Sequence, residues 1–243
     1  LSPEQQEKLK STAALFPDAL IDSELGEIPE GWSISNLKSE TSKIGSGATP
    51  RGGKGAYKEE GISQIRSMNV FDGNFLMKDL ARIDEVQAEK LKNVIVEEND
   101  VLLNITGASV TRCCIVPPSV MPARVNQHVC IIRANDTTMN PYYIYQLLTS
   151  PPGKSVLNTL AQSGATREAL TKAHIENFEL VVPDVKMISS FGRVAEKLEE
   201  MRFRLTETSS ILTKIRDTLL PKLLDGELES RQDNIKEEQI SYG

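Results

Sequence analysis

Residues 187–219, MISSFGRVAEKLEEMRFRLTETSSILTKIRDTL, decide how this part of the chain folds. Their apolar side chains recur at alternating steps of four and three residues, and Thr208 is the one polar member of the series. The series consists of Met187, Phe191, Val194, Leu198, Met201, Leu205, Thr208, Leu212, Ile215 and Leu219. A repeat of 3.5 residues held over more than four heptads predicts a coiled-coil helix rather than an ordinary surface helix.

Such a helix needs a partner. At a rise of about 1.5 Å per residue it would be roughly 50 Å long, which exceeds what the core of a domain of this size requires. The rest of the chain holds no second helical pattern of comparable length. We therefore expect the apolar seam to be buried against another long helix.

The charge of the chain is unevenly distributed. The 243 residues carry a net charge of −6, yet residues 41–175 hold 15 Lys and Arg against 12 Asp and Glu. The segments on either side are acidic, with net charges of −5 and −4. A mildly basic middle permits nucleic-acid binding without requiring it.

Several classes of protein are disfavoured by composition. No run of 18 apolar residues is present, so we expect no membrane span. The first residues do not resemble a signal peptide. They also lack Met, which is consistent with a numbering that begins inside a longer chain. Cys113, Cys114 and Cys130 lack CxxC spacing, which favours reduced thiols in a cytoplasmic protein. We expect no cofactor and no metal, with a zinc site from Cys113, Cys130 and His128 as the alternative.

We expect four segments along the chain. Residues 1–31 form a helix at 4–15 and an irregular acidic linker, 32–183 a globular domain, 184–228 the long helix and 229–243 a flexible tail. In the domain, strand-like runs occur at 62–66, 81–83, 94–96, 101–105, 113–116, 129–133 and 177–182, and helical runs at 84–91, 141–149 and 167–173. This pattern predicts an irregular α+β domain built around a curved mixed sheet.

The glycine-rich stretch 45–57, GSGATPRGGKGAY, is not a nucleotide-binding loop. A P-loop requires GxxxxGK followed by Ser or Thr, and Ala48 and Gly55 break that pattern. The stretch is either a solvated surface loop or a mobile loop that brings Arg51, Lys54 and Tyr57 to phosphates or base edges.

No catalytic site emerges. The sequence Asn-Pro-Tyr-Tyr at 140–143 resembles the Asn-Pro-Pro-Tyr motif of adenine-N6 methyltransferases, but it lacks the second Pro, and no glycine-rich cofactor loop accompanies it. Its apolar and aromatic positions fit a packed helix. Two histidines in the whole chain are few for acid–base catalysis.

Three polar stretches share one chemistry. They are NITGASVTR at 104–112, RVNQHV at 124–129 and QSGATR at 162–167. Small residues allow a backbone to approach a ligand, and Arg, Asn, Gln and Thr contact base edges and phosphates. Buried structural roles for Asn126 and Gln127 are the alternative interpretation.

The motifs resemble a known family when they are taken in order. They are IPEGW at 28–32, IGSGATP at 44–50, DVLLNITG at 100–107, VNQH at 125–128, NPYYIYQLL at 140–148, SGATR at 163–167 and LLPKLLDGEL at 219–228. Their order and spacing resemble the specificity subunit (HsdS) of type I restriction–modification enzymes over nearly the whole chain, although no single motif is specific.

The resemblance implies a non-catalytic subunit that recognises double-stranded DNA. Its partners would be methyltransferase subunits, two per pair of recognition domains, which methylate adenine, and restriction subunits, which cleave. A full-length member has two recognition domains, and the two helices that follow them pack antiparallel and set the spacer of a bipartite target. This chain has one of each, so it resembles a half-subunit or a C-terminal half. Pairing through C2 symmetry would then give a palindromic bipartite target.

Residue type and position in the family pattern indicate the candidate contacts. Those to DNA are Arg51, Lys54, Tyr57, Arg66, Asn69, Thr111, Arg112, Arg124, Gln127 and Arg167. The dimerisation seam would be Phe191, Val194, Leu198, Met201, Leu205, Thr208, Leu212, Ile215 and Leu219. The alternative function is a coiled-coil scaffold whose globular domain binds protein.

Overall fold

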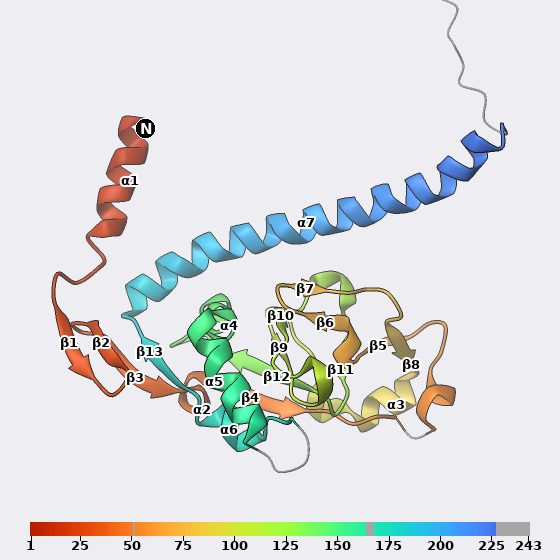
Figure 1. Cartoon of the computed structure of the whole chain (residues 1–243), viewed down its shortest axis with the longest axis horizontal. Coiled ribbons are helices and arrows are strands. Elements are labelled where there is room, and N and C mark those ends of the chain that lie inside the picture. The colour runs from red at the N-terminus through yellow and green to blue at the C-terminus, as the bar shows by residue number, and fades with distance from the viewer. Residues whose placement is uncertain (51, 164–167, 227–243) are drawn as a thin grey trace, which may run out of the picture. The chain divides into compact units, whose positions relative to one another are not determined.

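The computed structural model describes residues 1–50, 52–163 and 168–226. Leu1–Lys197 forms one compact unit, and a second unit begins at Leu198. The expected α+β class is confirmed, because the first unit contains several sheets and short helices and a long helix follows the last strand (Figure 1). No helix among the described residues is long and apolar enough to cross a membrane.

The long helix, α7, spans Val185–Leu224 and is 40 residues long, or about 60 Å at the usual rise. Its first turn is capped by Asp184, whose carboxylate accepts hydrogen bonds from the backbone N–H groups of Lys186 and Met187 at 2.8 and 3.0 Å. The helix continues through Pro221. Gly226, just beyond its end, has a φ of +72°, a conformation that glycine adopts without strain.

Two sheets form the centre of the first unit (Figure 1). The larger is antiparallel and has the order β10 (Cys113–Ile115), β9 (Val101–Asn104), β12 (Val129–Ala134), β4 (Thr41–Ser46). The smaller is mixed, since β5 (Ile62–Ile65) pairs in parallel with β11 (Ala123–Val125) and antiparallel with β8 (Ala81–Ile83). Fully buried side chains of both sheets, among them Ile65, Ile83, Leu102 and Ile131, belong to one hydrophobic cluster.

Three two-stranded pairings complete the strands. They are β1 (Leu20–Ser23) with β2 (Gly26–Pro29), β3 (Ser33–Asn36) with β13 (Glu179–Val182), and β6 (Val70–Phe71) with β7 (Asn74–Phe75). The β3–β13 pairing joins the first strand after the hairpin to the strand that precedes α7, so the sequence ends of the domain lie side by side.

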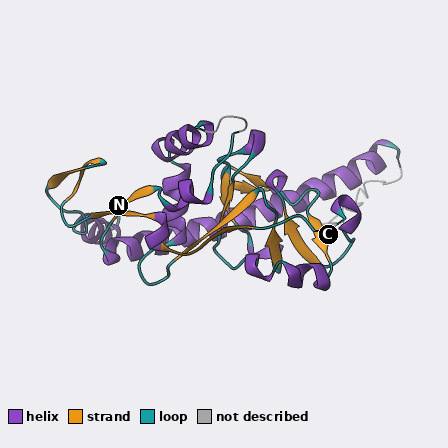
Figure 2. Cartoon of the chain, turned by 90° about the horizontal axis from the view of Figure 1, so that it is seen from below, coloured by secondary structure: helices purple, strands orange, loops and turns teal. Residues whose placement is uncertain are grey.

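Short helices precede the first strand or lie between later strands (Figure 2). They are α1 (Pro3–Ala13), α2 (Leu37–Glu40), α3 (Glu85–Lys90), α4 (Pro141–Thr149), α5 (Pro151–Gln162) and α6 (Lys172–Glu176), with 3₁₀ turns at Gly53–Ala56, Ser67–Asn69, Lys92–Val94, Gly107–Ser109 and Pro118–Val120. Asn140 and Ser150 cap α4 and α5, because their side chains accept from Tyr142 N and Gly153 N at 3.0 and 3.1 Å.

The structure differs from the sequence-based expectation at several places, and three of them concern segments to which the sequence assigned another conformation. Residues 16–31, expected to be an irregular linker, include the β1–β2 hairpin, which is mostly exposed and therefore shows no apolar alternation. The strand expected at 94–96 is the end of a 3₁₀ turn followed by one isolated bridge at Ile95. The helix expected at 167–173 begins at Lys172, where the Thr171 side chain caps it.

Candidate nucleic-acid interface

An open cleft of about 1010 Å³ lies in the first unit. Its walls come from parts of the chain that are far apart in sequence, namely the turn before β6, the loop after β9, the start of β12 and the segment before α6. It is lined by Ser67, Met68, Phe71, Leu76, Thr106, Gly107, Ala108, Ser109, Arg112, His128, Glu168 and Ala169. The cleft thus unites residues of, or next to, all three polar stretches identified in the sequence.

Backbone hydrogen bonds hold these stretches together. Ile105 N donates to His128 O at 3.0 Å, and Leu170 N donates to Ile105 O at 2.8 Å. Gly107 N donates to Glu168 O at 3.2 Å. The loop after β9 is therefore fixed on one side to the residue that opens β12 and on the other to the segment that leads into α6.

The loop of residues 104–112 is closed at its base. Asn104 N donates to Arg112 O, and Thr111 N donates to Asn104 O, both at 2.8 Å. The Asn104 side chain is fully buried and donates to Ser67 O at 2.9 Å, which ties the loop to the turn before β6. Thr111 has a φ of +69° and donates through its hydroxyl to Asn158 of α5 at 3.0 Å. Thr111 is only 5% exposed, so its side chain holds the loop against α5.

Arg112 is oriented by an aromatic ring. Its guanidinium carbon lies 4.4 Å from the centroid of the Phe71 ring, and both side chains line the cleft. Arg112 makes no ion pair within the part of the chain that the structure describes. The contact with the ring restricts the position of the guanidinium, and the planar set of N–H donors of this group suits bidentate contact with a base edge or a phosphate.

Gln127 and His128 form a hydrogen-bonded chain beside the cleft. Thr49 donates through its hydroxyl to Gln127 Oε1, and Gln127 Nε2 lies 3.1 Å from His128 Nε2. His128 Nδ1 is hydrogen bonded to the hydroxyl of Thr106, and His128 N donates to Asn126 Oδ1 at 3.0 Å. Gln127 is exposed, whereas Asn126 is buried, so a structural role fits Asn126 alone.

Gly47 allows the glycine-rich loop to approach the hydrogen-bonded residues Gln127 and His128. A Cβ at Gly47 would lie 1.7 Å from Val125 O, and Gly47 N donates to Asn126 O at 3.1 Å. Only a glycine permits that approach. The loop is thereby pressed against the segment between β11 and β12, which brings Thr49 to Gln127.

Besides Thr111, two of the candidate DNA contacts are buried and bonded within the fold. Asn69 is fully buried and donates to Leu76 O at 2.9 Å, and its Oδ1 accepts from Arg66 N at 3.1 Å. Arg124 is 9% exposed and donates to Ala88 O and Ala123 O at 3.2 and 3.0 Å. Burial lowers the pKa of Arg124, because desolvation disfavours the charged guanidinium.

The remaining candidates divide between described and undescribed residues. Arg66 lies 5.3 Å from the centroid of the Tyr57 ring and donates to Asp79 O, so these two side chains form a separate group. Arg51 and Arg167 lie outside the described residues, as does the side chain of Lys54. Phe71 and Met68 of the cleft were not anticipated, and their sequence context gives no signal. Thr106 and His128 lay within quoted motifs, but pairing between them is not visible in sequence.

The described residues contain no group of three or more His, Cys, Asp and Glu side chains that could hold a metal ion. Cys113 and Cys130 are buried in β10 and β12. Burial raises the pKa of both thiols, that of Cys130 to about 12, because a buried thiolate loses its hydration. These cysteines therefore behave as core residues.

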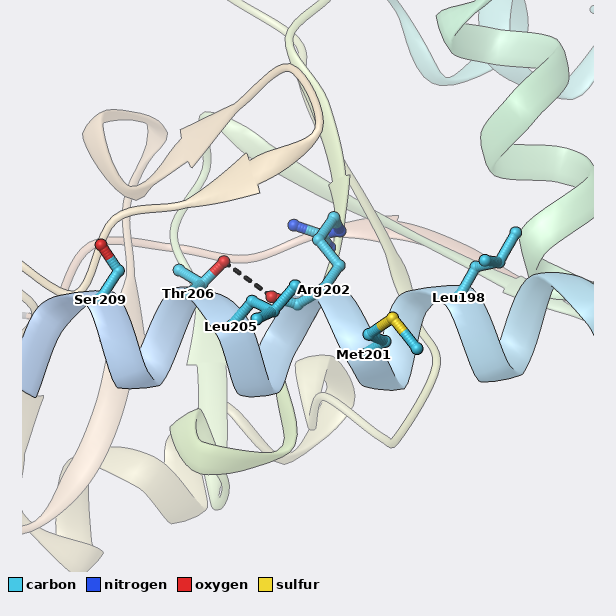
Figure 3. Close-up of a pocket in the computed structure, with 6 residues that line it drawn as sticks. All are labelled: Leu198, Met201, Arg202, Leu205, Thr206 and Ser209. Carbon is cyan, nitrogen blue, oxygen red and sulfur yellow. Dashed lines mark hydrogen bonds between the residues drawn. The ribbon is translucent and has the colours of Figure 1, made fainter.

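The seam of α7 is exposed beyond its first turns. Phe191 packs edge-to-face against Tyr143 of α4, with ring centroids 5.8 Å apart, so the seam begins inside its own domain. From Val194 onward the apolar members are exposed, with Leu198 at 61% and Leu205 at 63%. Figure 3 shows Leu198, Met201 and Leu205 on the helix beside the polar Arg202, Thr206 and Ser209, and these six residues line a shallow groove of about 440 Å³.

No family model matches the chain. Among curated proteins it is similar to the type I restriction enzyme MjaIX specificity subunit of Methanocaldococcus jannaschii, with 25% identity over 83% of this chain and 45% of the relative. It is also similar to the HindI specificity subunit of Haemophilus influenzae, with 22% identity over 93% of this chain and 49% of the relative. The chain spans about half the length of the curated relatives it matches.

Solved structures share the fold. The S subunit of a type I restriction–modification system from M. genitalium superposes with a TM-score of 0.57 and 15% identity, over 79% of this chain and 46% of that one. The HsdS subunit from Thermoanaerobacter tengcongensis gives 0.52 and 15%, over 82% and 49%. The curated relatives confirm the resemblance to type I specificity subunits that the motifs indicated, and the solved structures show that the fold is shared.

Proposed function

We propose that this chain is a sequence-specific DNA-recognition subunit of a type I restriction–modification system and carries no catalytic activity itself. The observation that supports it most is the cleft in which Arg112, His128 and the loop of residues 104–112 converge, in a chain similar to specificity subunits over most of its length. Arg, amide and hydroxyl side chains beside small residues are suited to bases and phosphates.

Among the candidate contacts, the geometry favours the exposed and oriented ones. Arg112 and Gln127 would read base edges. Residue type alone makes Arg51, Lys54 and Arg167 candidates for phosphate contacts. Tyr57 and Arg66 form a second group that would contact the backbone of the duplex. Asn69, Thr111 and Arg124 act indirectly, because their side chains are bonded within the domain and hold the loops.

The exposed face of α7 supports assembly with another chain. Its apolar residues repeat every 3.5 positions and are exposed, and the contact of apolar surface with water is unfavourable. A second helix that covers this surface would therefore lower the free energy. We propose that a second copy pairs antiparallel with α7 about a two-fold axis, through the seam from Val194 to Leu219 with Phe191 at its start. Two recognition domains would then address the inverted halves of a palindromic bipartite target.

The remaining partners follow from the family. Two methyltransferase subunits per recognition pair would methylate adenine, and restriction subunits would cleave unmodified DNA. Such a complex would act in the cytoplasm, where the chromosome lies. This chain would position those subunits on the target.

The test is methylome sequencing of cells that carry the chain with its methyltransferase and restriction subunits. We expect methylated adenine in two inverted half-sites separated by a fixed spacer. Cells with the Arg112→Glu variant should lose or change the motif, because the charge facing the duplex is reversed. If the chain is instead a protein-binding scaffold, methylation should survive Arg112→Glu, and that result would contradict the proposal.

A further inference from the structure

The side-chain amide of Gln127 is exposed and yet held at both of its polar atoms. Its Oε1 accepts from the Thr49 hydroxyl, and its Nε2 lies 3.1 Å from His128 Nε2. His128 is held in turn, since its Nδ1 bonds to the Thr106 hydroxyl. An exposed glutamine normally samples several rotamers, and these contacts remove that freedom before any ligand arrives.

The amide keeps one unused hydrogen-bonding group of each kind. A glutamine amide has two N–H donors and two carbonyl lone pairs. One N–H is directed to His128 and one lone pair accepts from Thr49, and Gln127 has no further side-chain partner among the described residues. One N–H donor and one lone pair of the carbonyl oxygen remain, and the count is the same for either orientation of the amide.

In the major groove this pair of groups matches one base. Adenine offers an N6–H donor beside the N7 acceptor there, whereas guanine offers two acceptors, cytosine a donor and thymine an acceptor. In the minor groove adenine and thymine offer acceptors only and guanine adds an N2–H donor, but that groove is about 6 Å wide, whereas the major groove is about 12 Å wide and admits protein elements. We propose that Gln127 reads an adenine from the major groove, accepting from N6–H and donating to N7. Thr49 and His128 are positioning residues for this contact. This inference rests on the proposed DNA-recognition function.

The surroundings of Gln127 allow a duplex to approach. His128, the next residue, lines the cleft together with Gly107. A Cβ at Gly107 would meet nothing within 4 Å, so the space beyond the loop of residues 104–112 is open. Arg112 also lines the cleft and would supply a charged contact to the same DNA segment. A base reader beside a cationic residue is the usual composition of a direct-readout site.

The experiment replaces one acceptor nitrogen of the DNA by C–H and truncates one side chain of the protein. Binding of the chain, assembled with its methyltransferase subunits, is measured on target duplexes in which each adenine is replaced in turn by 7-deazaadenine, which lacks the N7 acceptor. We expect one position in each half-site at which the replacement weakens wild-type binding by about 5- to 150-fold. The Gln127→Ala complex should bind less tightly and show no sensitivity at that position. Gln146→Ala, which alters an exposed amide on α4, should behave as wild type.

A second pair of variants tests the positioning. Thr49→Val deletes the hydroxyl that holds Gln127 Oε1, whereas Thr49→Ser keeps it. We expect Thr49→Val to reduce the discrimination between adenine and the other bases at the sensitive position, and Thr49→Ser to preserve it. Equal discrimination by both variants would overturn the positioning role.

The outcomes separate this inference from the function on which it rests. If Gln127→Ala weakens all sequences equally and lowers the salt dependence of binding, Gln127 contacts a phosphate and the inference is wrong. It is also wrong if Gln127→Ala retains the sensitivity to 7-deazaadenine. If the wild-type complex shows no specific binding to any duplex, the proposed function itself fails.

Discussion

The guanidinium carbon of Arg112 lies 4.4 Å from the centroid of the Phe71 ring, although the two residues belong to different strand pairs and are 41 positions apart. Phe71 ends β6, and Arg112 precedes β10, whose first residue donates from its backbone to Asp72 at 3.0 Å. The ring and the charge are therefore placed by the same hydrogen bond, from Cys113 N to the side-chain carboxylate of Asp72. This pairing fixes the direction in which the cation of the cleft points.

Replacing Arg112 by Ala should weaken specific binding by about 1–3 kcal/mol if its guanidinium makes a bidentate base contact. Phe71→Leu keeps the charge and an apolar side chain but removes the aromatic face, so it should cost a smaller part of that energy. Both effects are measured as binding of the assembled complex to the target at fixed salt. Unchanged specific binding by Arg112→Ala would remove this residue from the set of contacts.

Asn69 should contribute to stability rather than to DNA contact. Asn69→Ala leaves Leu76 O and Lys78 O without their side-chain donor and Arg66 N without its acceptor, inside a fully buried site. We expect a loss of about 1–3 kcal/mol in the free energy of unfolding, measured by urea denaturation. Asn93→Ala is the matched control, because Asn93 is exposed, and its variant should unfold like the wild type. Equal stability of the two variants would contradict the structural role.

The elements that were predicted correctly have local signals. α4 was predicted with the bounds that it has, since Asn140-Pro141 begins a helix and the following apolar residues repeat with its period. The next helix, α5, was missed because Pro151-Pro152-Gly153 is typical of a turn, whereas here the prolines occupy its first turn. Contacts between segments that are distant in sequence were not predicted either. The polar stretches were therefore identified, but not that they line one cleft.

Burial explains where the site prediction became imprecise. Asn69 and Arg124 have the side chains of DNA contacts, and nothing in their residue type distinguishes an amide bonded to the backbone from one that faces solvent. Gln127 and Asn126 are neighbours with the same functional group, and only the structure separates the exposed member from the buried one. Sequence thus indicates the chemistry of the proposed interface, and tertiary contacts determine which of its residues are exposed.

The seam of α7 should govern self-association. Leu205→Glu places a charge in the middle of the proposed helix pair, where it would be desolvated beside apolar neighbours, so the dimer should give way to a monomer. Ser210→Glu adds the same charge at the heptad position farthest from the seam and should leave the dimer intact. The solution mass of both variants at micromolar concentration is the measurement. A wild-type monomer, or a Leu205→Glu dimer, would contradict the two-fold pairing.

The length of α7 should set the spacer between half-sites. Deleting one heptad, residues 199–205, removes about 10 Å of helix and keeps the 3.5-residue register, so the seam stays continuous. Ten ångströms correspond to roughly three base pairs of duplex at 3.4 Å each. Methylome sequencing should therefore show the same half-site sequences with a spacer shorter by about three base pairs. Deleting only residues 199 and 200 is the control, since two residues turn the remaining seam by about 200°, to the opposite face of the helix, and should abolish assembly. A heptad deletion that changes the half-sites, or leaves the spacer as it was, would show that α7 does not measure the target.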